Sequence, residues 1–192
     1  LLYIGTNTKM YQTCSRTSEF LTELGKQLKS IDRSHMELFV IPSFISLERA
    51  GEIAFDYKIR LGAQNMAWED EGQFTGEISP VMLKEAGVTI AEIGHSERRH
   101  ILGETDEMEN QKVHAAIRHK ITALLCVGET GQQKDHGIAS EILRIQIKEG
   151  LYGVSAKDAK SIWIAYEPVW AIGNGGKPAS PEYAQQQHQV IR

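Results

Sequence analysis

The sequence predicts an α/β fold in which strands and helices alternate along one chain. Six short apolar runs of strand length recur within the 192 residues, and each is followed by a segment with the apolar spacing of a helix. The runs are continuous rather than alternating, which indicates that both faces of every strand are buried, as in a parallel sheet covered by helices. The turns lack the Gly-x-Gly-x-x-Gly pattern of dinucleotide-binding sheets. Repeated βα units of this kind favour a (β/α) barrel, in which chemistry takes place at the carboxyl ends of the strands.

The N-terminal part of the chain contains the first three βα units. Residues 1–5 form the first predicted strand, and a polar loop separates it from an amphipathic helix. Residues 38–41 form the second strand, and Pro42-Ser43 is expected to open the helix that follows. The third strand, residues 59–64, leads through a long polar loop to a short helix that Ser79-Pro80 begins. The buried face of the first helix is predicted to contain Phe20, Leu24, Leu28 and Ile31, and that of the second Phe44, Leu47, Ala50, Gly51 and Ala54.

The C-terminal part of the chain contains three further units. Strands are expected at residues 88–93, 121–127 and 161–166. Ser180 is expected to cap the last helix. The buried face of the helix before it is predicted to contain Ile138, Ile142 and Ile145, and that of the helix after the fourth strand Val113, Ala116 and Ile117.

Composition and charge narrow the class of protein. Hydrophobic residues make up 41% of the chain and charged residues 24%, which is usual for a soluble globular protein. A net charge of −4 argues against a nucleic-acid or membrane partner, since both need a basic face. No apolar run approaches the length of a membrane span. The two cysteines are too few and too far apart for a disulfide framework, and no Cys/His spacing matches a zinc site. A soluble, cytoplasmic protein is expected.

The stretch from Ser161 to Lys177 carries the clearest functional signal. A strand-like run ends at Glu167-Pro168, because a residue before proline is pushed into extended geometry and proline donates no ladder hydrogen bond. This leaves a carboxylate at the tip of a strand. The apolar residues 169–172 and the glycines after them suit a loop that moves as a unit about flexible ends. The stretch is interpreted as a base with a lid, and the alternative is an ordinary connection with a solvated glutamate.

Three further side chains are expected beside Glu167, because a parallel barrel brings the carboxyl ends of its strands to one rim. Asn7 and Lys9 follow the first strand, and His95 follows the fourth. A carboxylate can remove a proton from a carbon next to a carbonyl, while an imidazole and an ammonium stabilise the oxyanion that forms. Since His95 precedes an expected helix start, the helix dipole favours a neutral, hydrogen-bond-donating ring. The set predicts proton-transfer chemistry.

Short motifs spread over the whole chain are similar to those of one enzyme family. In order they are Asn7-x-Lys9-Met10, Gly62-Ala-Gln-Asn65, Phe74-Thr75-Gly76-Glu77, Ile93-Gly-His95-Ser-Glu-Arg-Arg99, Cys126-Val-Gly-Glu129 and Ala165-Tyr-Glu167-Pro-Val-Trp-Ala-Ile-Gly173. The chain thus resembles the triosephosphate isomerase family. The resemblance implies a (β/α)8 fold, the TIM barrel, and an aldose–ketose isomerase that interconverts dihydroxyacetone phosphate and D-glyceraldehyde 3-phosphate through an enediolate. It also implies that the enzyme needs no metal or cofactor and serves glycolysis and gluconeogenesis.

The resemblance assigns roles to the residues at the strand tips. It makes Glu167 the catalytic base and His95 the electrophile. Lys9 would be both catalytic and substrate-binding, and Asn7 would bind the phosphorylated sugar as well. These roles agree with the proton-transfer chemistry that the residue types predict.

The resemblance also implies supporting residues and a partner. Gly173 would donate a backbone hydrogen bond to the substrate phosphate, and Ser96 and Glu97 would support the catalytic site. Residues 65–79 would be the dimer loop of a homodimer, with Thr75 reaching the neighbouring subunit's site. Such a loop, without secondary structure in a compact barrel, usually has a function. Three apolar residues in it would otherwise face water, namely Met66, Trp68 and Phe74.

Three features depart from the family pattern. Thr8 stands where the family usually has tryptophan, and the lid tip from Gly173 to Lys177 is one residue longer than the common form. Both changes leave open a paralogue that isomerises a four-carbon ketose phosphate such as erythrulose phosphate. The third feature is length, since a closed eight-unit barrel takes at least about 200 residues. We therefore expect one barrel domain, residues 1–192, that lacks its C-terminal two βα units, and an inactive barrel fragment is a further alternative.

Overall fold

The computed structural model describes residues 1–173 and 175–192, and the chain divides into two compact units. The first unit comprises residues 1–92 and 115–123, and the second comprises residues 93–114 and 124–192. Strands and helices alternate through both, and the strands follow one another in the sheet in sequence order from β1 to β6. The predicted α/β class is confirmed, whereas the single domain stays a prediction. Among the described residues, every helix is too short or too polar to span a lipid bilayer.

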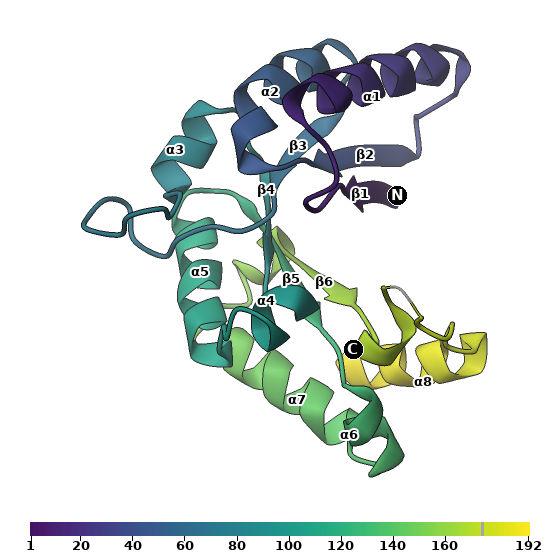
Figure 1. The fold of residues 1–192 in the computed structure, drawn as a ribbon. Coiled ribbons are helices and arrows are strands. Elements are labelled where there is room, and N and C mark those ends of the chain that lie inside the picture. The colour runs from purple at the N-terminus through teal and green to yellow at the C-terminus, as the bar shows by residue number, and fades with distance from the viewer. Residues whose placement is uncertain (174) are drawn as a thin grey trace. The chain divides into compact units, whose positions relative to one another are not determined.

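The first unit holds the N-terminal βα units (Figure 1). β1 pairs with β2 in parallel along its whole length, and β2–β3 and β3–β4 are parallel as well. α1 and α2 pack against each other and cover one face of these strands (Figure 1). The elements are β1 (Leu2–Asn7), α1 (Cys14–Gln27), η1 (Leu28–Ser30), β2 (Met36–Ile41), η2 (Phe44–Ser46), α2 (Leu47–Asp56), β3 (Arg60–Ala63), α3 (Pro80–Glu85) and most of β4 (Ile90–Ile93).

The second unit holds the elements that follow. Ser180 accepts a hydrogen bond from the Tyr183 N–H at the start of α8, so its predicted capping role is confirmed. Thr130 and Gln133 form a capping box at the start of α6. The elements are α4 (Ser96–His100), most of α5 (Asp106–Arg118) and of β5 (Thr122–Val127), α6 (Gly131–Asp135), α7 (Ala139–Gly150), η3 (Ala159–Ser161), β6 (Ile162–Tyr166), η4 (Val169–Ala171) and α8 (Pro181–Ile191).

The strands differ in burial. Every residue of β4 is buried, whereas Leu2, Tyr3 and Ile4 of β1 are 54%, 47% and 45% exposed. The prediction that both faces of every strand are buried is therefore wrong for β1. The reason is position, because β1 stands at one end of the strand order and has β2 as its neighbour.

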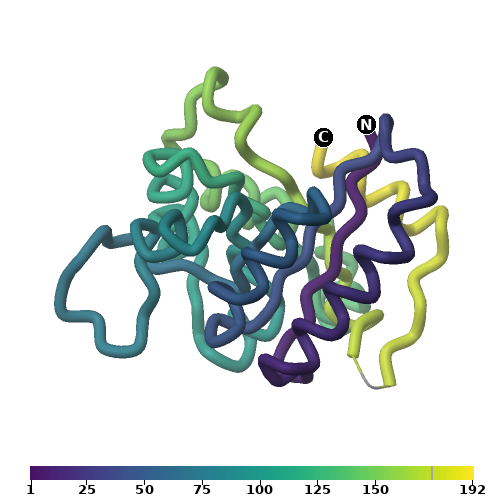
Figure 2. Tube along the Cα trace, turned by 90° about the horizontal axis from the view of Figure 1, so that it is seen from above, coloured from purple at the N-terminus to yellow at the C-terminus, as the bar shows by residue number. Residues whose placement is uncertain are grey.

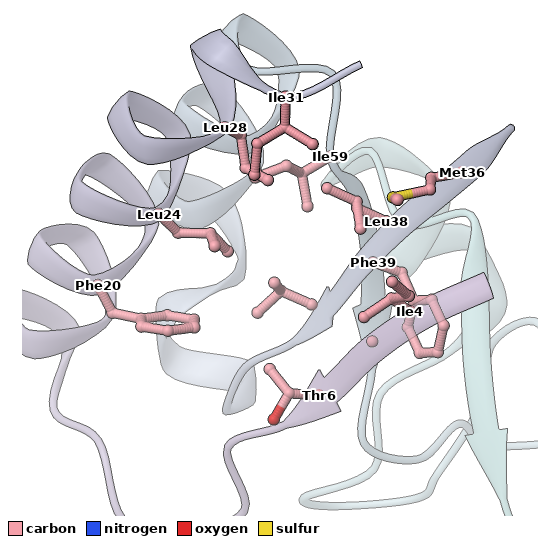
Figure 3. A pocket seen from close by; sticks show the side chains of 12 residues that line it. Ile4, Thr6, Phe20, Leu24, Leu28, Ile31, Met36, Leu38, Phe39 and Ile59 are labelled. Carbon is pink, nitrogen blue, oxygen red and sulfur yellow. The ribbon is translucent and has the colours of Figure 1, made fainter. Parts of the chain in front are cut away.

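An apolar groove of about 360 Å³ lies between α1 and the strands β1 and β2 (Figure 3). Phe20 and Leu24 line it from the helix, and Ile4 lines it from β1. Ile31, predicted on the buried helical face, also lines the groove but is 48% exposed. That prediction is wrong because α1 ends at Gln27 and the chain continues as a 3₁₀ turn, whose three residues per turn rotate Ile31 off the helical stripe.

The buried face of α7 is not the face that the apolar pattern predicts. Ile138 and Ile145 are 39% and 51% exposed, so this prediction is wrong. The polar Gln146 is buried because its side chain accepts the Gly128 N–H at 2.9 Å and donates to the Gly128 carbonyl at 3.1 Å. The side-chain amide of Gln146 thus gives a hydrogen-bond partner to both the buried N–H and the buried carbonyl of Gly128, which an apolar side chain cannot do. The buried residues of α7 are Ala139, Leu143, Gln146 and Gly150.

Replacing Gln146 with leucine is expected to lower the free energy of unfolding by about 2 kcal/mol or more, because two buried backbone groups of Gly128 lose their partners. Urea unfolding at equilibrium measures the change. Ile145→Ala on the exposed side of the same helix is the matched control and is expected to change stability by about 0.5 kcal/mol or less. Equal unfolding midpoints for Gln146→Leu and the wild type would contradict this account.

The long loop predicted after the third strand is present. Residues 64–79 lie between β3 and α3 and project from the first unit, at the left of Figure 2. Met66 is 0% exposed, so the expectation that it faces water is wrong. The loop folds back on itself next to Met66, since the Ala67 N–H donates to the Ile78 carbonyl at 2.9 Å. Phe74 is 44% exposed and lies edge to face with Trp68.

Candidate active site

In the first unit, a hydrogen-bond cluster surrounds the loop that follows β1. Asn7 Oδ1 accepts the Lys9 backbone N–H at 2.7 Å and the Gln64 side-chain amide at 3.1 Å. Gln64 also donates to the Lys9 carbonyl at 2.9 Å. These bonds hold Lys9 at a φ of 49°, in the left-handed region that residues with a side chain seldom adopt. The structure thus places the predicted residues Asn7 and Lys9 in one fixed turn.

The acidic residue Glu92 of β4 belongs to the same cluster. It is 5% exposed, and its carboxylate accepts a hydrogen bond from Asn7 Nδ2. Neither Glu92 nor Gln64 was predicted to be a site residue. A signal for Glu92 was present, because it is the one charged residue in the apolar run 88–93. A charge in a buried strand needs a partner, and a strand tip is where a functional partner is expected.

In the second unit, His95 occupies the N-cap position of α4, as predicted for a residue at a helix start. Its Nδ1 accepts the Glu97 backbone N–H at 3.2 Å. A neutral ring in this position therefore carries its proton on Nε2. Nε2 lies 3.5 Å from Oε1 of Glu167, and the histidine side chain is 7% exposed. The ring is thus oriented to donate a hydrogen bond from Nε2.

Glu167 is the first residue after β6, which ends at Tyr166. The Glu-Pro pair predicted this strand end correctly. Its backbone N–H donates to the Val127 carbonyl at 2.8 Å, and its Oε2 accepts the Ser96 N–H at 3.4 Å. A side chain at Gly128 would come within 1.8 Å of the Glu167 carbonyl oxygen, so only glycine allows this approach. The bond from the Ser96 N–H is long and therefore weak, so it holds the carboxylate only loosely.

Ser96 is buried, whereas the three other predicted site residues lie at exposed positions. The Glu97 side chain is 47% exposed, with Oε2 3.5 Å from Nδ1 of His95. Gly173 is exposed and has a φ of 76°. Thr75 is exposed on the loop of the first unit. The predicted lid tip includes position 174, which lies outside the described residues.

Glu129 is fully buried and anchors the segment that follows β6. Its carboxylate accepts hydrogen bonds from the Tyr166 hydroxyl at 3.0 Å, the Trp170 indole at 2.7 Å and the Tyr183 hydroxyl at 2.8 Å. The Val169 N–H donates to its backbone carbonyl at 3.0 Å. Burial and the Glu129 carboxylate raise the pKa of both tyrosine hydroxyls above the ordinary value, so they stay donors. Glu129 was part of a quoted motif but had no predicted role, although an acid two residues after a buried strand was the signal.

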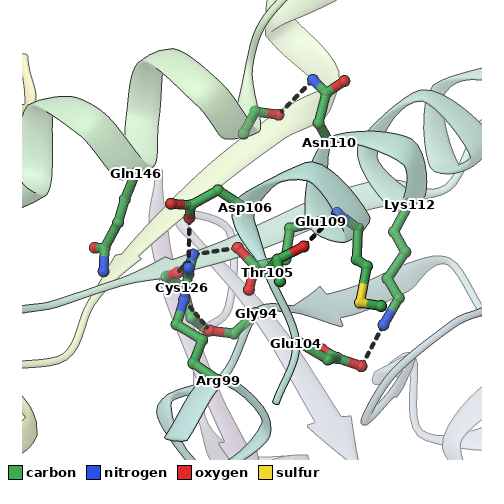
Figure 4. A network of polar contacts seen from close by, with 12 residues as sticks. Gly94, Arg99, Glu104, Thr105, Asp106, Glu109, Asn110, Lys112, Cys126 and Gln146 are labelled. Atoms are coloured by element: carbon green, nitrogen blue, oxygen red, sulfur yellow. Dashed lines mark hydrogen bonds and ion pairs between the residues drawn. The ribbon is translucent and has the colours of Figure 1, made fainter.

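Arg99 fixes the loop at the tip of β4 from inside the second unit (Figure 4). Its guanidinium donates to the carbonyls of Gly94 at 2.8 Å and Cys126 at 3.0 Å. It also pairs with Asp106 at 2.6 Å and with the buried Glu109. Gly94 has a φ of 71°, and a side chain there would come within 2.6 Å of the Glu109 carboxyl group. The network therefore sets the backbone position of the residue that precedes His95.

The stability of the protein is expected to depend on pH through the carboxyl group of Glu109. Burial raises the pKa of its carboxyl group to about 8, although the Arg99 guanidinium beside it acts in the opposite direction. The folded state then binds more protons than the unfolded state between about pH 5 and pH 8, so the free energy of unfolding falls as the pH rises through this window. In Glu109→Gln this contribution is absent. Urea unfolding at three pH values is expected to show a shallower decline for Glu109→Gln than for the wild type, and equal slopes would contradict the assignment.

Comparison with known proteins agrees with this arrangement. The triosephosphate isomerase family model matches residues 2–192. The triosephosphate isomerase of Carboxydothermus hydrogenoformans is 46% identical over 99% of this chain and 74% of its own length, and that of Caldanaerobacter subterraneus subsp. tengcongensis is 46% identical over 98% and 75%. The L-erythrulose-1-phosphate isomerase of Rhizobium etli is 42% identical over 100% of this chain and 72% of its own length.

The family match also settles the fold class. The predicted TIM-barrel class is confirmed, with six successive βα units in this chain. The match extends over almost every residue, from β1 to α8, and includes both groups of predicted site residues. The chain therefore belongs to the triosephosphate isomerase family.

Proposed function

We propose that the protein is an aldose–ketose isomerase that interconverts dihydroxyacetone phosphate and D-glyceraldehyde 3-phosphate. The observation that carries this proposal is the pairing of His95 with Glu167, in which Nε2 and Oε1 are 3.5 Å apart. A hydrogen-bond donor and a carboxylate at this separation can act on the carbonyl oxygen and the adjacent carbon of one small substrate. The family match and the names of the triosephosphate isomerase relatives support the same reaction.

The reaction proceeds by proton transfer between neighbouring carbons. Glu167 removes a proton from C1 of dihydroxyacetone phosphate, and the electron pair moves to the C2 carbonyl oxygen, which His95 stabilises by donating from Nε2. Proton exchange between the two oxygens of the enediolate follows. Protonated Glu167 then returns its proton to C2, and D-glyceraldehyde 3-phosphate leaves with all atoms conserved.

The remaining residues bind and orient the substrate. Lys9 supplies a positive charge for the phosphorylated substrate and the oxyanion, and Asn7 fixes the turn that carries it. Gly173 donates its backbone N–H to the phosphate. Ser96 and Glu97 support the catalytic pair, since the Ser96 N–H holds the Glu167 carboxylate and the Glu97 N–H fixes the histidine tautomer.

A four-carbon substrate is the second candidate. The Rhizobium etli relative is named an L-erythrulose-1-phosphate isomerase and matches the whole chain. Thr8 gives a structural reason to test it, because this residue is 9% exposed between Asn7 and Lys9 and its hydroxyl is buried. Threonine leaves more room beside the substrate-binding turn than a larger aromatic residue would.

A coupled assay with dihydroxyacetone phosphate and L-erythrulose 1-phosphate tests both candidates. The proposal predicts a kcat/KM at least about tenfold higher for the three-carbon substrate, a difference of about 1.4 kcal/mol in transition-state binding. A higher kcat/KM for L-erythrulose 1-phosphate would instead assign the four-carbon reaction to this protein. Turnover of neither substrate would contradict both candidates.

A cytoplasmic homodimer completes the proposal. The loop at residues 65–79 is the proposed interface, since it projects from the first unit (Figure 2). Its residues Thr75 and Phe74 are exposed. Asp70 holds the loop to α5 by accepting from Arg118 and His119 at 2.7 Å each, and these bonds lower the pKa of Asp70.

Phe74→Asp is expected to weaken the dimer by about tenfold or more, because the substitution places a charge in an apolar contact. Sedimentation velocity over a range of micromolar concentrations measures the monomer–dimer equilibrium. Glu69→Gln, an exposed change on the same loop, serves as the control. A wild-type protein that is monomeric and fully active at these concentrations would contradict the dimer.

A further inference from the structure

We propose that Glu92 is a positioning residue: its carboxylate fixes the orientation of the Asn7 side-chain amide, and through it the turn that carries Lys9. The catalytic consequence of this inference rests on the proposed function, because Lys9 and Asn7 bind the substrate there. The structural part concerns the first unit alone, which contains Glu92, Asn7, Lys9 and Gln64.

The orientation of the Asn7 amide follows from its partners. Oδ1 faces two donors, the Lys9 backbone N–H at 2.7 Å and the Gln64 amide nitrogen at 3.1 Å. Nδ2 faces the Glu92 carboxylate, which accepts its hydrogen bond. The reversed amide would place an NH₂ group against two donors and a carbonyl oxygen against a carboxylate. An acceptor at position 92 therefore selects the orientation that the turn needs.

The turn depends on this orientation because Lys9 has a φ of 49°. The bond from the Lys9 N–H to Asn7 Oδ1 closes an Asx-type turn over two residues, and such bonds stabilise local geometries that the backbone alone disfavours. Gln64 braces the same turn by donating to the Lys9 carbonyl at 2.9 Å. The direction in which the Lys9 side chain leaves the backbone is set by this geometry.

The setting of Glu92 argues for a specific role rather than for simple packing. Ile90, Ala91 and Ile93 of the same strand are all 0% exposed, and Glu92 itself is 5% exposed. An apolar residue would fill this position without the desolvation that a buried carboxylate requires. The register pairs Ala63 of β3 with Ala91 of β4, so the next residues along the chain are Gln64, directly after β3, and Glu92, near the end of β4. The two strand tips therefore present a donor and an acceptor to Asn7.

Three substitutions separate the hydrogen bond from the charge. Glu92→Leu removes the acceptor, Glu92→Asp keeps the charge but withdraws it by one methylene, and Glu92→Gln keeps an acceptor without the charge. We expect KM for dihydroxyacetone phosphate to rise about tenfold in Glu92→Leu and Glu92→Asp, with a smaller change in kcat, because the binding turn is displaced while the base is untouched. Glu92→Gln is expected to stay within about threefold of the wild type. Ile90→Val is the control for a buried change in β4 and is expected to leave KM unchanged.

NMR of the Asn7 side-chain amide protons in the substrate-free protein gives a readout that does not need turnover. The resonance of the Asn7 amide proton that is hydrogen-bonded to Glu92 is expected to shift upfield in Glu92→Asp and Glu92→Leu. In Glu92→Gln this resonance is expected to keep its position. Unchanged Asn7 resonances in Glu92→Asp, or a Glu92→Gln variant as impaired as Glu92→Leu, would overturn the inference.

If the wild type turns over neither sugar phosphate, the proposed function fails and the NMR comparison alone decides the role of Glu92. Should Glu92→Leu not fold, Glu92→Asp and Glu92→Gln still give the decisive contrast.

Discussion

Replacement of Glu167 with glutamine is expected to lower kcat by about 10³-fold with KM within a few-fold of the wild-type value. Glutamine has nearly the same shape and can still accept the Ser96 N–H, which lies 3.4 Å from the carboxylate in the native protein. It cannot take a proton from carbon, so the change removes the base and leaves substrate binding intact. Steady-state kinetics in both directions measures the loss.

Glu167→Asp tests the geometry of the same group. Shortening the side chain by one methylene moves the carboxylate by about 1 Å, and a misplacement of this size costs about a hundredfold in rate. The backbone at this position is held by the bond from the Glu167 N–H to the Val127 carbonyl, so it cannot follow the shortened side chain. A Glu167→Gln variant that keeps most of the wild-type kcat would remove Glu167 from the role of base.

Replacement of His95 with leucine is expected to lower kcat by about 10²–10³-fold, because the enediolate loses its hydrogen-bond donor. Leucine keeps most of the volume of a side chain that is 7% exposed, so the fold is expected to survive. The Glu97 N–H loses its acceptor, but Glu97 itself is exposed, and we expect water to take the place of the ring nitrogen.

The control for His95 lies on the same helix. His100→Gln changes an exposed histidine at the end of α4 and is expected to alter kcat less than about twofold. Both variants are compared with the wild type by circular dichroism and steady-state kinetics. A His95→Leu variant with native-like structure and a kcat near that of the wild type would show that the imidazole is not the electrophile.

Local signals predicted much of the fold and the site. The Glu167-Pro168 pair placed the end of β6 correctly, and Ser79 and Ser180 cap α3 and α8 as expected. His95 stands at a helix start because the residues around it encode one. These predictions depend on a few neighbouring residues, so the sequence contains the necessary information directly.

Features that depend on distant partners were not predictable in the same way. The burial of Gln146 follows from its bonds to Gly128, and the role of Glu92 follows from a bond to Asn7, 85 positions away in the chain. Each polar side chain is buried because a partner from another element satisfies it. Ile145 looked like a core residue because the apolar pattern contains no information about those partners.

The proton transfer between two carbons of the substrate is proposed to run through Glu167. It is tested most directly by converting dihydroxyacetone phosphate in D₂O, trapping the D-glyceraldehyde 3-phosphate as it forms and locating deuterium by proton NMR. Since a protonated carboxylate exchanges with solvent, the account predicts that a large share of the wild-type product carries deuterium at C2 and that Glu167→Gln forms this product about 10³-fold more slowly. Product formed by Glu167→Gln at the wild-type rate would contradict it.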